Sequence, residues 1–234
     1  MSVVPGGSAR TLFSTALLAC FVLSVALACK KRAESKLSPA AAAQAEKLKP
    51  EVKLRLTQLS SLAAKSKSLP QTSTDEPPTK AVAPGIISEN QLDDPHKTLS
   101  SDELDVGDST FSVCKSKLES TALKDEDIQW LERCSKLTTA GVIRQKSFVR
   151  PEVDASTRSF KPGEFRGDIV VFDLATAEVR ARYSLDVQND SQLRLEGNPD
   201  QRAWERLAES ELKRKVTSVI QAKLLEGNKR VMGL

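Results

Sequence analysis

The aromatic side chains of this 234-residue chain are concentrated in one region. Of the ten Phe, Tyr and Trp residues, eight lie between Phe111 and Trp204, and none lies between Cys29 and Thr110. Burying one large apolar side chain stabilises a fold by about 1.5–3 kcal/mol, so a hydrophobic core forms where such side chains are frequent. The sequence therefore predicts one folded domain over residues 109–234.

The charges divide the chain in a similar way. Residues 30–80 carry eleven basic and five acidic side chains, whereas residues 81–234 carry 23 basic and 26 acidic ones. The formal net charge of the whole chain is +4, which is too small to indicate a nucleic-acid-binding surface. Four Cys and one His offer few ligands for a metal. We therefore expect no metal, no other cofactor and no nucleic-acid partner.

The N-terminus has the pattern of an export signal. Arg10 precedes an apolar run that ends in Ala26-Leu27-Ala28-Cys29. Small residues before a cleavage point are typical of a signal peptide. A Cys directly after them resembles the bacterial lipobox, and this resemblance implies cleavage before the Cys and acylation of its sulfur. We therefore expect a signal peptide over residues 1–28 and lipidation of Cys29.

Three alternatives to this interpretation stay open. Leu17-Leu18-Ala19-Cys20 also fits the lipobox, but modification of Cys20 would leave an apolar segment on the mature protein. The run from Thr11 to Cys29 is just long enough to cross about 30 Å of hydrocarbon as an uncleaved anchor. Lys30, Lys31 and Arg32 would then hold the C-terminal domain in the cytoplasm. The third alternative is simple secretion, and we favour lipidation at Cys29 over all three.

The residue after Cys29 bears on which membrane would hold the lipid. In the enteric lipoproteins that this signal resembles, an Asp at that position is associated with retention at the inner membrane, and Lys30 stands there in this chain. The expected location is therefore the bacterial cell envelope, at the outer membrane facing the periplasm.

Residues 29–108 are expected to form a basic, Pro-rich tether that gives the domain a long reach from the membrane. Ser38-Pro39 can start a helix, and Pro50 interrupts it. A thin apolar stripe with helical spacing follows, made of Val52, Leu54, Leu56, Leu59, Leu62 and Ala63. We predict a marginal helix in solvent, with contact to lipid or a partner helix as the alternative. Residues 66–84 are rich in Pro, Ser and Thr and predict a linker.

Two short helical patterns, Thr110–Leu123 and Asp125–Leu137, open the predicted domain. Cys114 and Cys134 lie on their apolar stripes and are the only Cys residues after the signal region. An even pair of Cys in an exported domain is usually bridged, and antiparallel helices would bring the two together. The sequence therefore predicts a Cys114–Cys134 disulfide, with two buried thiols as the alternative in a cytoplasmic domain.

The remainder predicts an α+β fold. A strand over residues 140–150 is followed by Asp168–Leu174, which is β-branched and aromatic, and by Val179–Val187, in which apolar and polar residues alternate. The last two segments predict a hairpin. A helix from Asp200 to about Gly227 has an apolar stripe that should cover the sheet. The expected fold is a small antiparallel sheet covered by a C-terminal helix and preceded by a short helical pair.

One part of the domain resembles known sequences. The strand that contains Phe172-Asp173-Leu174-Ala175-Thr176, together with the helix that follows, resembles uncharacterised bacterial lipoproteins, many of which have a Gly where Ala177 stands. It is also similar to periplasmic lipoproteins that assist envelope assembly, such as activators of peptidoglycan synthases. The resemblance implies an envelope role and carries over no catalytic residue.

Few side chains indicate catalysis. His96 is the only His and lies in a polar loop, and the chain has no nucleophile-elbow or phosphate-loop motif. Asp173, Glu205 and Glu209 are the conceivable acid and base residues. A carboxylate-dependent hydrolase of cell-wall or carbohydrate material is therefore the alternative function.

The favoured function is a lipid-anchored binding or adaptor module without catalysis. Its expected partners are the membrane, through the lipid, and an envelope protein or glycan. If the final helix covers one face of the predicted hairpin, the other face is polar and carries Arg180, Arg182 and Ser184. These three residues are the predicted contact surface.

Overall fold

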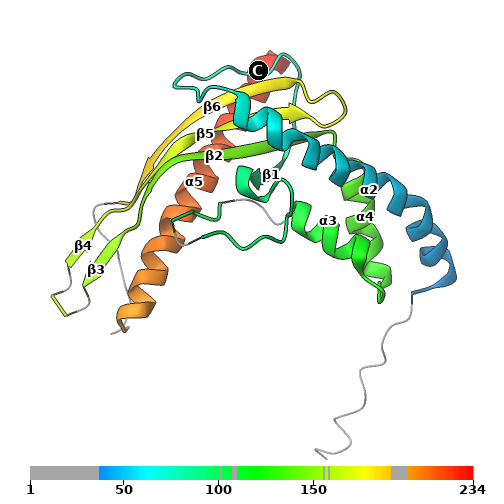
Figure 1. Cartoon of the computed structure of the whole chain (residues 1–234), viewed down its shortest axis with the longest axis horizontal. Coiled ribbons are helices and arrows are strands. Elements are labelled where there is room, and N and C mark those ends of the chain that lie inside the picture. The colour runs from blue at the N-terminus through cyan, green and yellow to red at the C-terminus, as the bar shows by residue number, and fades with distance from the viewer. Residues whose placement is uncertain are drawn as a thin grey trace, which may run out of the picture. The chain divides into compact units, whose positions relative to one another are not determined.

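The computed structural model describes residues 37–100, 102–106, 110–154, 156–157, 159–190 and 200–233 (Figure 1). The chain divides into two compact units, Met1–Lys36 and Leu37–Leu234, and all of the described residues belong to the second unit. The expected signal peptide and the predicted lipidation site Cys29 lie outside the described residues. The second unit has an α+β fold, as expected from the sequence.

The central sheet has the strand order β1-β2-β5-β6. β2 (Thr139–Val149), β5 (Glu164–Asp173) and β6 (Val179–Gln188) pair in antiparallel fashion, which confirms the predicted strand and hairpin. β1 (Gly85–Ser88) pairs in parallel with β2 at one edge. The sheet is therefore mixed rather than purely antiparallel, because β1 comes from the segment that was expected to be a tether.

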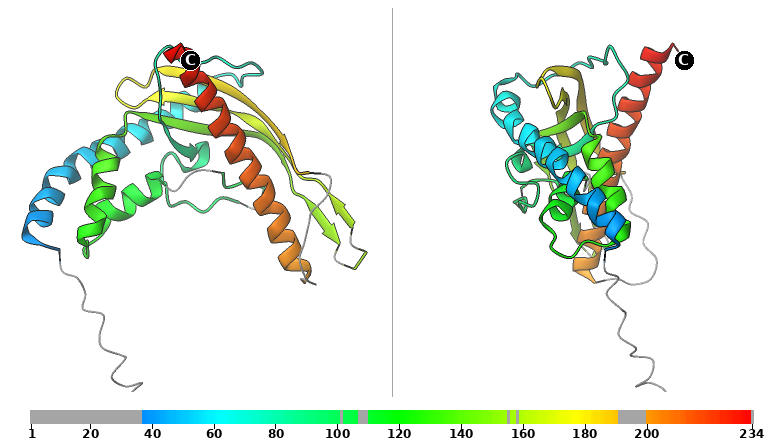
Figure 2. Two further views of the ribbon diagram at one scale, coloured as in Figure 1. Left: turned by 180° about the vertical axis from the view of Figure 1, so that it is seen from behind. Right: turned by 90° about the vertical axis from the view of Figure 1, so that its right-hand side faces the viewer.

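The C-terminal helix α5 (Gln201–Met232) covers one face of the sheet (Figure 2). Asp200 caps it by accepting a hydrogen bond from the Ala203 amide at 2.7 Å. The core on this face combines helix and sheet side chains, including Leu212, Val216 and Ile220 of α5 with Ile169, Val171, Tyr183 and Leu185 of the sheet. The predicted packing of this helix on the sheet is confirmed.

α5 runs five residues beyond Gly227, where the sequence predicted its end, and stops before Gly233, which has a φ of 71°. Gly227 has a packing role instead. A Cβ atom at this position would collide with the Tyr183 hydroxyl oxygen and lie 2.9 Å from Pro78 Cδ. Glycine therefore allows α5 to approach β6 closely at this point.

The opposite face of the sheet is covered by α2 (Pro39–Ser68), as the right-hand view of Figure 2 shows. Leu59 and Leu62 of α2 are fully buried and pack with apolar residues of the sheet, including Ala140, Val142, Val170 and Phe172. Ser38 caps the helix by accepting a hydrogen bond from the Ala41 amide at 3.3 Å. The helix predicted to be marginal is therefore a structural layer of the fold.

The expected tether over residues 29–108 is thus corrected for the part that the structure describes. The folded unit begins at Leu37 and not at residue 109. Leu and Ala side chains of α2, together with β1, supply apolar surface without any aromatic residue. Aromatic content alone therefore placed the domain boundary too late in the chain.

The remaining elements are short. α3 (Thr110–Glu119), η2 (Asp125–Asp127) and α4 (Ile128–Ser135) correspond to the predicted helical pair and pack against the N-terminal part of α2. η1 (Glu89–Gln91) follows β1. β3 (Glu152–Asp154) and β4 (Ser159–Lys161) form a separate two-stranded sheet between β2 and β5 in sequence.

Candidate functional site

The structure places Arg182 and Ser184 on the face of β6 away from α5, as the alternation required, whereas Arg180 lies at a register shift between Val179 and Ala181, where the alternation is interrupted. They do not form a free surface. The Arg182 amide and carbonyl exchange two hydrogen bonds with Glu76, at 2.9 and 2.7 Å, and its side chain is only 17% exposed. The Ser184 amide donates to the Asp75 carboxylate at 2.9 Å. The prediction of an open face at Arg182 and Ser184 was wrong, because another segment of the chain covers it.

Arg180 is also engaged within the chain. Its guanidinium donates to the Asp173 carboxylate at 2.8 Å. Asp173 also accepts hydrogen bonds from the Ala175 and Thr176 amides, so its carboxylate fixes the β5–β6 turn. The hydrogen bond from Arg180 is the main cause that holds the pKa of Asp173 below its ordinary value. The Asp173–Arg180 pair stabilises this turn, so the Arg180 guanidinium is already engaged by a carboxylate of the same chain.

The segment that covers β6 is part of the predicted linker, residues 69–84, which we call the belt. The belt starts at the end of α2 on one face of the sheet and ends at β1. It is fixed first by Arg144 of β2, whose guanidinium donates to the carbonyl oxygens of Leu69 at 2.7 Å and Pro70 at 2.9 Å. Arg144 also donates to the Ser66 carbonyl at 3.0 Å, so it caps the C-terminus of α2.

Arg144 forms a buried ion pair with Asp168 of β5. The Arg144 Nε atom lies 2.7 Å from Asp168 Oδ1, and a second hydrogen bond joins the two groups. The side chains are 4% and 0% exposed. Asp168 also accepts a hydrogen bond from the Thr72 amide of the belt at 2.8 Å. The pair therefore holds α2, β2, β5 and the belt together, and sequence inspection missed it because its members are far apart in the chain.

Further along, the belt passes from β6 to α5. The Asp75 carboxylate accepts from Lys223 of α5 at 2.6 Å as well as from Ser184. Burial raises the pKa of Asp75, but the hydrogen bonds from Lys223 and Ser184 outweigh it, so the pKa lies below its ordinary value. The Asn228 side chain then pairs with the amide and carbonyl of Val82, at 2.8 and 2.7 Å. The belt thus ties the edge of the sheet to the C-terminal part of α5.

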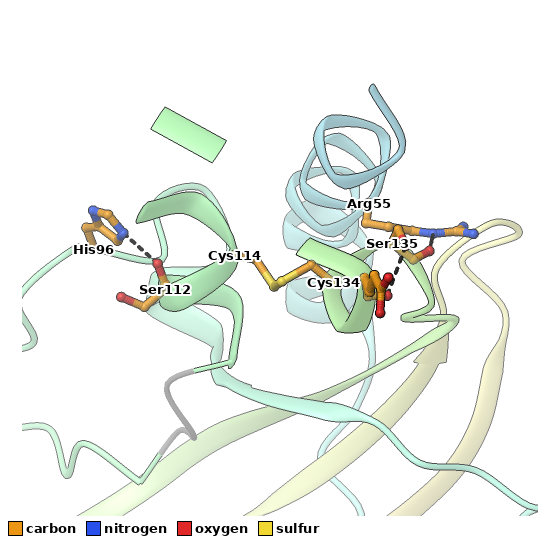
Figure 3. Close-up of a disulfide and its surroundings, with 7 residues drawn as sticks. Arg55, His96, Ser112, Cys114, Cys134 and Ser135 are labelled. Atoms are coloured by element: carbon orange, nitrogen blue, oxygen red, sulfur yellow. Dashed lines mark hydrogen bonds between the residues drawn. A yellow bond between two sulfur atoms is a disulfide. The ribbon is translucent and has the colours of Figure 1, made fainter. Parts of the chain in front are cut away.

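The predicted disulfide is present between α3 and α4. The Cys114 and Cys134 sulfur atoms are 2.02 Å apart and the Cα atoms 5.7 Å apart (Figure 3). Both residues are fully buried and pack in one cluster with Ala45 and Val52 of α2. The bridge therefore fixes the helical pair against which the N-terminal part of α2 packs.

The only His of the chain is not paired with a nucleophile. His96 Nε2 lies 2.9 Å from the backbone oxygen of Ser112, as the dashed line in Figure 3 shows. The neighbouring Asp94 carboxylate binds Lys115 at 2.7 Å and accepts a hydrogen bond from the His96 amide at 3.0 Å. These contacts attach the loop that carries His96 to α3.

Asp173 lies far from the other two conceivable acid and base residues, Glu205 and Glu209, which are four residues apart on α5. Glu209 of α5 contacts Arg150, directly after the last residue of β2, at 3.6 Å. Asp173 pairs with Thr139, the first residue of β2. The eleven residues of β2 separate these positions by about 35 Å. Asp173 therefore cannot work with Glu209 across one substrate bond, for which two carboxyl groups less than about 10 Å apart are needed.

A different part of the sheet is exposed. At the end next to β3 and β4, no helix covers the face on which α2 lies (Figure 1). Val149 is 54% exposed there, and the side chains of Arg166 and Asp186 are 55% and 74% exposed. We call this area, Val149, Arg166, Asp186 and the neighbouring Ser147 and Gln188, the open sheet end. Its two β6 residues, Asp186 and Gln188, continue the alternating polar positions of that strand beyond the part that the belt covers.

Across the described residues, no three His, Cys, Asp or Glu side chains gather where they could bind a metal ion. Within the same part of the chain, no helix is long and apolar enough to span a membrane.

Comparisons with known proteins add no identification. No protein-family model, no curated protein and no solved structure matches this chain. The resemblance to bacterial lipoproteins therefore remains an expectation from the sequence.

Proposed function

We propose that this chain is a lipoprotein of the bacterial cell envelope, acylated at Cys29, whose folded unit binds an envelope partner and catalyses no reaction. The observation that carries the proposal is a buried disulfide in a unit that begins shortly after the lipobox-like segment. Disulfides persist in oxidising compartments such as the periplasm and are rare in the cytoplasm. The Cys114–Cys134 bridge therefore supports export over the cytoplasmic anchor.

The start of the folded unit limits the reach of the protein. Eight peptide links join Cys29 to Leu37, and they extend to at most about 28 Å. A lipid on Cys29 keeps the start of α2 within this distance of the membrane surface. The proposed module therefore acts close to its own membrane. This short link replaces the long reach that was expected from a tether over residues 29–108.

The organisation of the fold favours binding over hydrolysis. Asp173 and Glu209 lie at opposite ends of β2, and Asp173 is engaged by Arg180. The open sheet end, in contrast, presents polar and apolar side chains on three hydrogen-bonded strands, β2, β5 and β6. A rigid exposed surface suits recognition of a partner.

Metabolic labelling with a palmitate analogue tests the anchor. We expect Cys29→Ser to abolish incorporation of the label into the chain. The matched control is Cys20→Ser, which removes the alternative lipobox Cys and should leave labelling unchanged. Undiminished label on Cys29→Ser, or loss of label only on Cys20→Ser, would show that the anchor site is wrong.

A further inference from the structure

One edge of the sheet has backbone groups that face outward. β6 pairs with β5 on one side, and on the other side Arg182 exchanges hydrogen bonds with Glu76 of the belt. Strand residues alternate in this respect, so the amides and carbonyls of Ser184, Asp186 and Gln188 also point away from β5. The Ser184 amide is bound by Asp75, and the Gln188 carbonyl accepts from Lys215 at 3.4 Å. In the described part of the chain, the Asp186 amide and carbonyl have no partner.

The belt shows that this edge accepts an extended segment. Glu76 pairs with Arg182 as an antiparallel strand residue does. The pairing ends there because Pro77 and Pro78 follow, and proline has no N–H to donate. On the other side of Glu76, the Thr72 amide turns to Asp168 on the sheet face instead of following the edge. The edge from Ser184 to Gln188 is left open by the course of the belt.

The surroundings of this edge are acidic toward solvent. In four ion pairs along it the carboxylate is more exposed than its basic partner, whereas in the second pairs of Arg166 with Glu164 and of Lys215 with Glu211 the base is more exposed. The exposed fractions of the side chains are as follows: Glu76 (57%) with Arg182 (17%), Asp75 (40%) with Lys223 (26%), Asp186 (74%) with Arg166 (55%), and Asp190 (69%) with Lys215 (24%). Of the eight side chains in the four pairs, the three most exposed are the carboxylates of Asp186, Asp190 and Glu76.

We propose that the β6 edge from Ser184 to Gln188 binds an extended, basic segment of a partner protein as an additional strand. The inference rests on the proposed binding function and specifies its surface and its partner. Backbone hydrogen bonds to Asp186 supply the pairing, and basic side chains of the added strand meet the exposed carboxylates. β5 and β6 lie between the added strand and β2, so Asp186 and Gln188 are the residues of the open sheet end that adjoin it.

The basic run of the same molecule does not reach this edge. Arg32 is five peptide links before Leu37, which extend to at most about 18 Å. α2 has 30 residues and is about 45 Å long, and its C-terminal end is the one that Arg144 fixes beside β5. Five peptide links from the start of α2 are too short to bring this run to β6, so the proposal takes the occupant from a partner protein.

A synthetic peptide in which Lys alternates with Val serves as the probe. Its binding to the full chain in a non-ionic detergent is measured by fluorescence anisotropy. We expect saturable binding, and no binding of the same peptide with Glu in place of Lys. N-methylation of the peptide amides that face β6 removes their donors and should weaken binding by about tenfold or more.

Variants of the protein locate the site. Asp186→Lys should weaken binding of the Lys–Val peptide about tenfold. The matched control is Glu51→Lys, the same charge change at an exposed position of α2, which should leave binding unchanged. Should Asp186→Lys fail to fold, the N-methylated peptide tests the pairing on the native protein.

Several results would overturn the inference. Equal binding of the N-methylated peptide would show charge attraction without strand pairing, and equal loss in both variants would place the site elsewhere. Self-association of the chain that Asp186→Lys abolishes would identify a second copy as the occupant. The proposed function can fail separately. If the unchanged chain takes up no palmitate label but still binds the peptide, the lipid anchor at Cys29 is refuted and the edge site is not.

Discussion

Replacement of Asp168 by Asn should destabilise the fold strongly, because Asp168 and Arg144 form a buried ion pair. The Asp168 carboxylate accepts two hydrogen bonds from Arg144 and one from the Thr72 amide. An Asn side chain has one acceptor oxygen and turns an NH2 group toward these donors. Removing one charge of a buried pair costs about 3–5 kcal/mol. This is a large share of the about 5–15 kcal/mol that stabilises a typical domain.

The double variant Arg144→Met with Asp168→Leu separates two explanations of this loss. When the two charged groups of a buried ion pair bind only each other, replacing both by apolar residues often leaves the free energy of unfolding unchanged. Here Arg144 also binds the carbonyl oxygens of Ser66, Leu69 and Pro70. In the double variant Leu69 and Pro70 lose this donor, whereas Ser66 keeps the hydrogen bond from the Leu69 amide. Each unsatisfied buried group costs about 1–3 kcal/mol. We therefore expect the double variant to be no more stable than Asp168→Asn.

Urea unfolding followed by far-UV circular dichroism measures both effects through the midpoint and the slope. The control is Lys161→Met in the ion pair with Glu152, whose side chains are 78% and 69% exposed, and it should leave the midpoint unchanged. A double variant as stable as the unchanged protein would refute the reasoning. It would show that the belt does not depend on Arg144.

Three further predictions concern other contacts of the fold. Replacing Cys114 and Cys134 by Ser should lower the free energy of unfolding by about 3 kcal/mol, measured in urea with a reduced sample of the unchanged protein as the comparison. Gly227→Ala should destabilise by about 1–3 kcal/mol because its Cβ meets the Tyr183 hydroxyl, and adding Tyr183→Phe should restore part of the loss; no recovery would contradict this account. Asp75→Asn should destabilise at neutral pH. Because the folded-state pKa of Asp75 is lowered, its contribution is complete above the ordinary value of 3.8 and disappears as the pH falls through the lowered value, so unfolding curves of the two proteins should converge in acid.

The parts of the fold that sequence inspection predicted correctly depend on local patterns. The alternation of Ala181–Val187 places its apolar residues against α5, and the apolar stripe after Asp200 forms the core-facing side of that helix. Val179, predicted to share this face, lies beyond a register shift and packs in the cluster on the α2 face. The disulfide followed from two Cys residues on the stripes of neighbouring helices. Each of these signals lies within a few residues in the chain, so it can be detected without knowing the fold.

What could not be predicted depends on contacts between distant segments. The stripe of α2 was recognised, and Val52, Leu59, Leu62 and Ala63 are buried as it indicates, whereas Leu54 is 52% exposed. Its stripe is thin because the aromatic partner, Phe172, comes from the sheet. Arg144 is one of three basic residues in the strand predicted over residues 140–150, and only its contact with Asp168 and the belt explains its burial.

The belt, which the sequence predicted to be a linker, also determines which part of the β6 edge is exposed. A Pro-rich stretch such as residues 69–84 is typical of a flexible linker because its amides cannot all form secondary structure. Here Arg144, Asp168 and Asn228 bind its backbone groups individually, so the belt is ordered by side chains instead of a strand ladder. A belt held in this way contacts β6 through Asp75 and Glu76 and leaves the backbone groups of Asp186 unpaired within the described residues. The arrangement covers the contact face predicted from the sequence and moves the available surface to Asp186, a few residues further along the same strand.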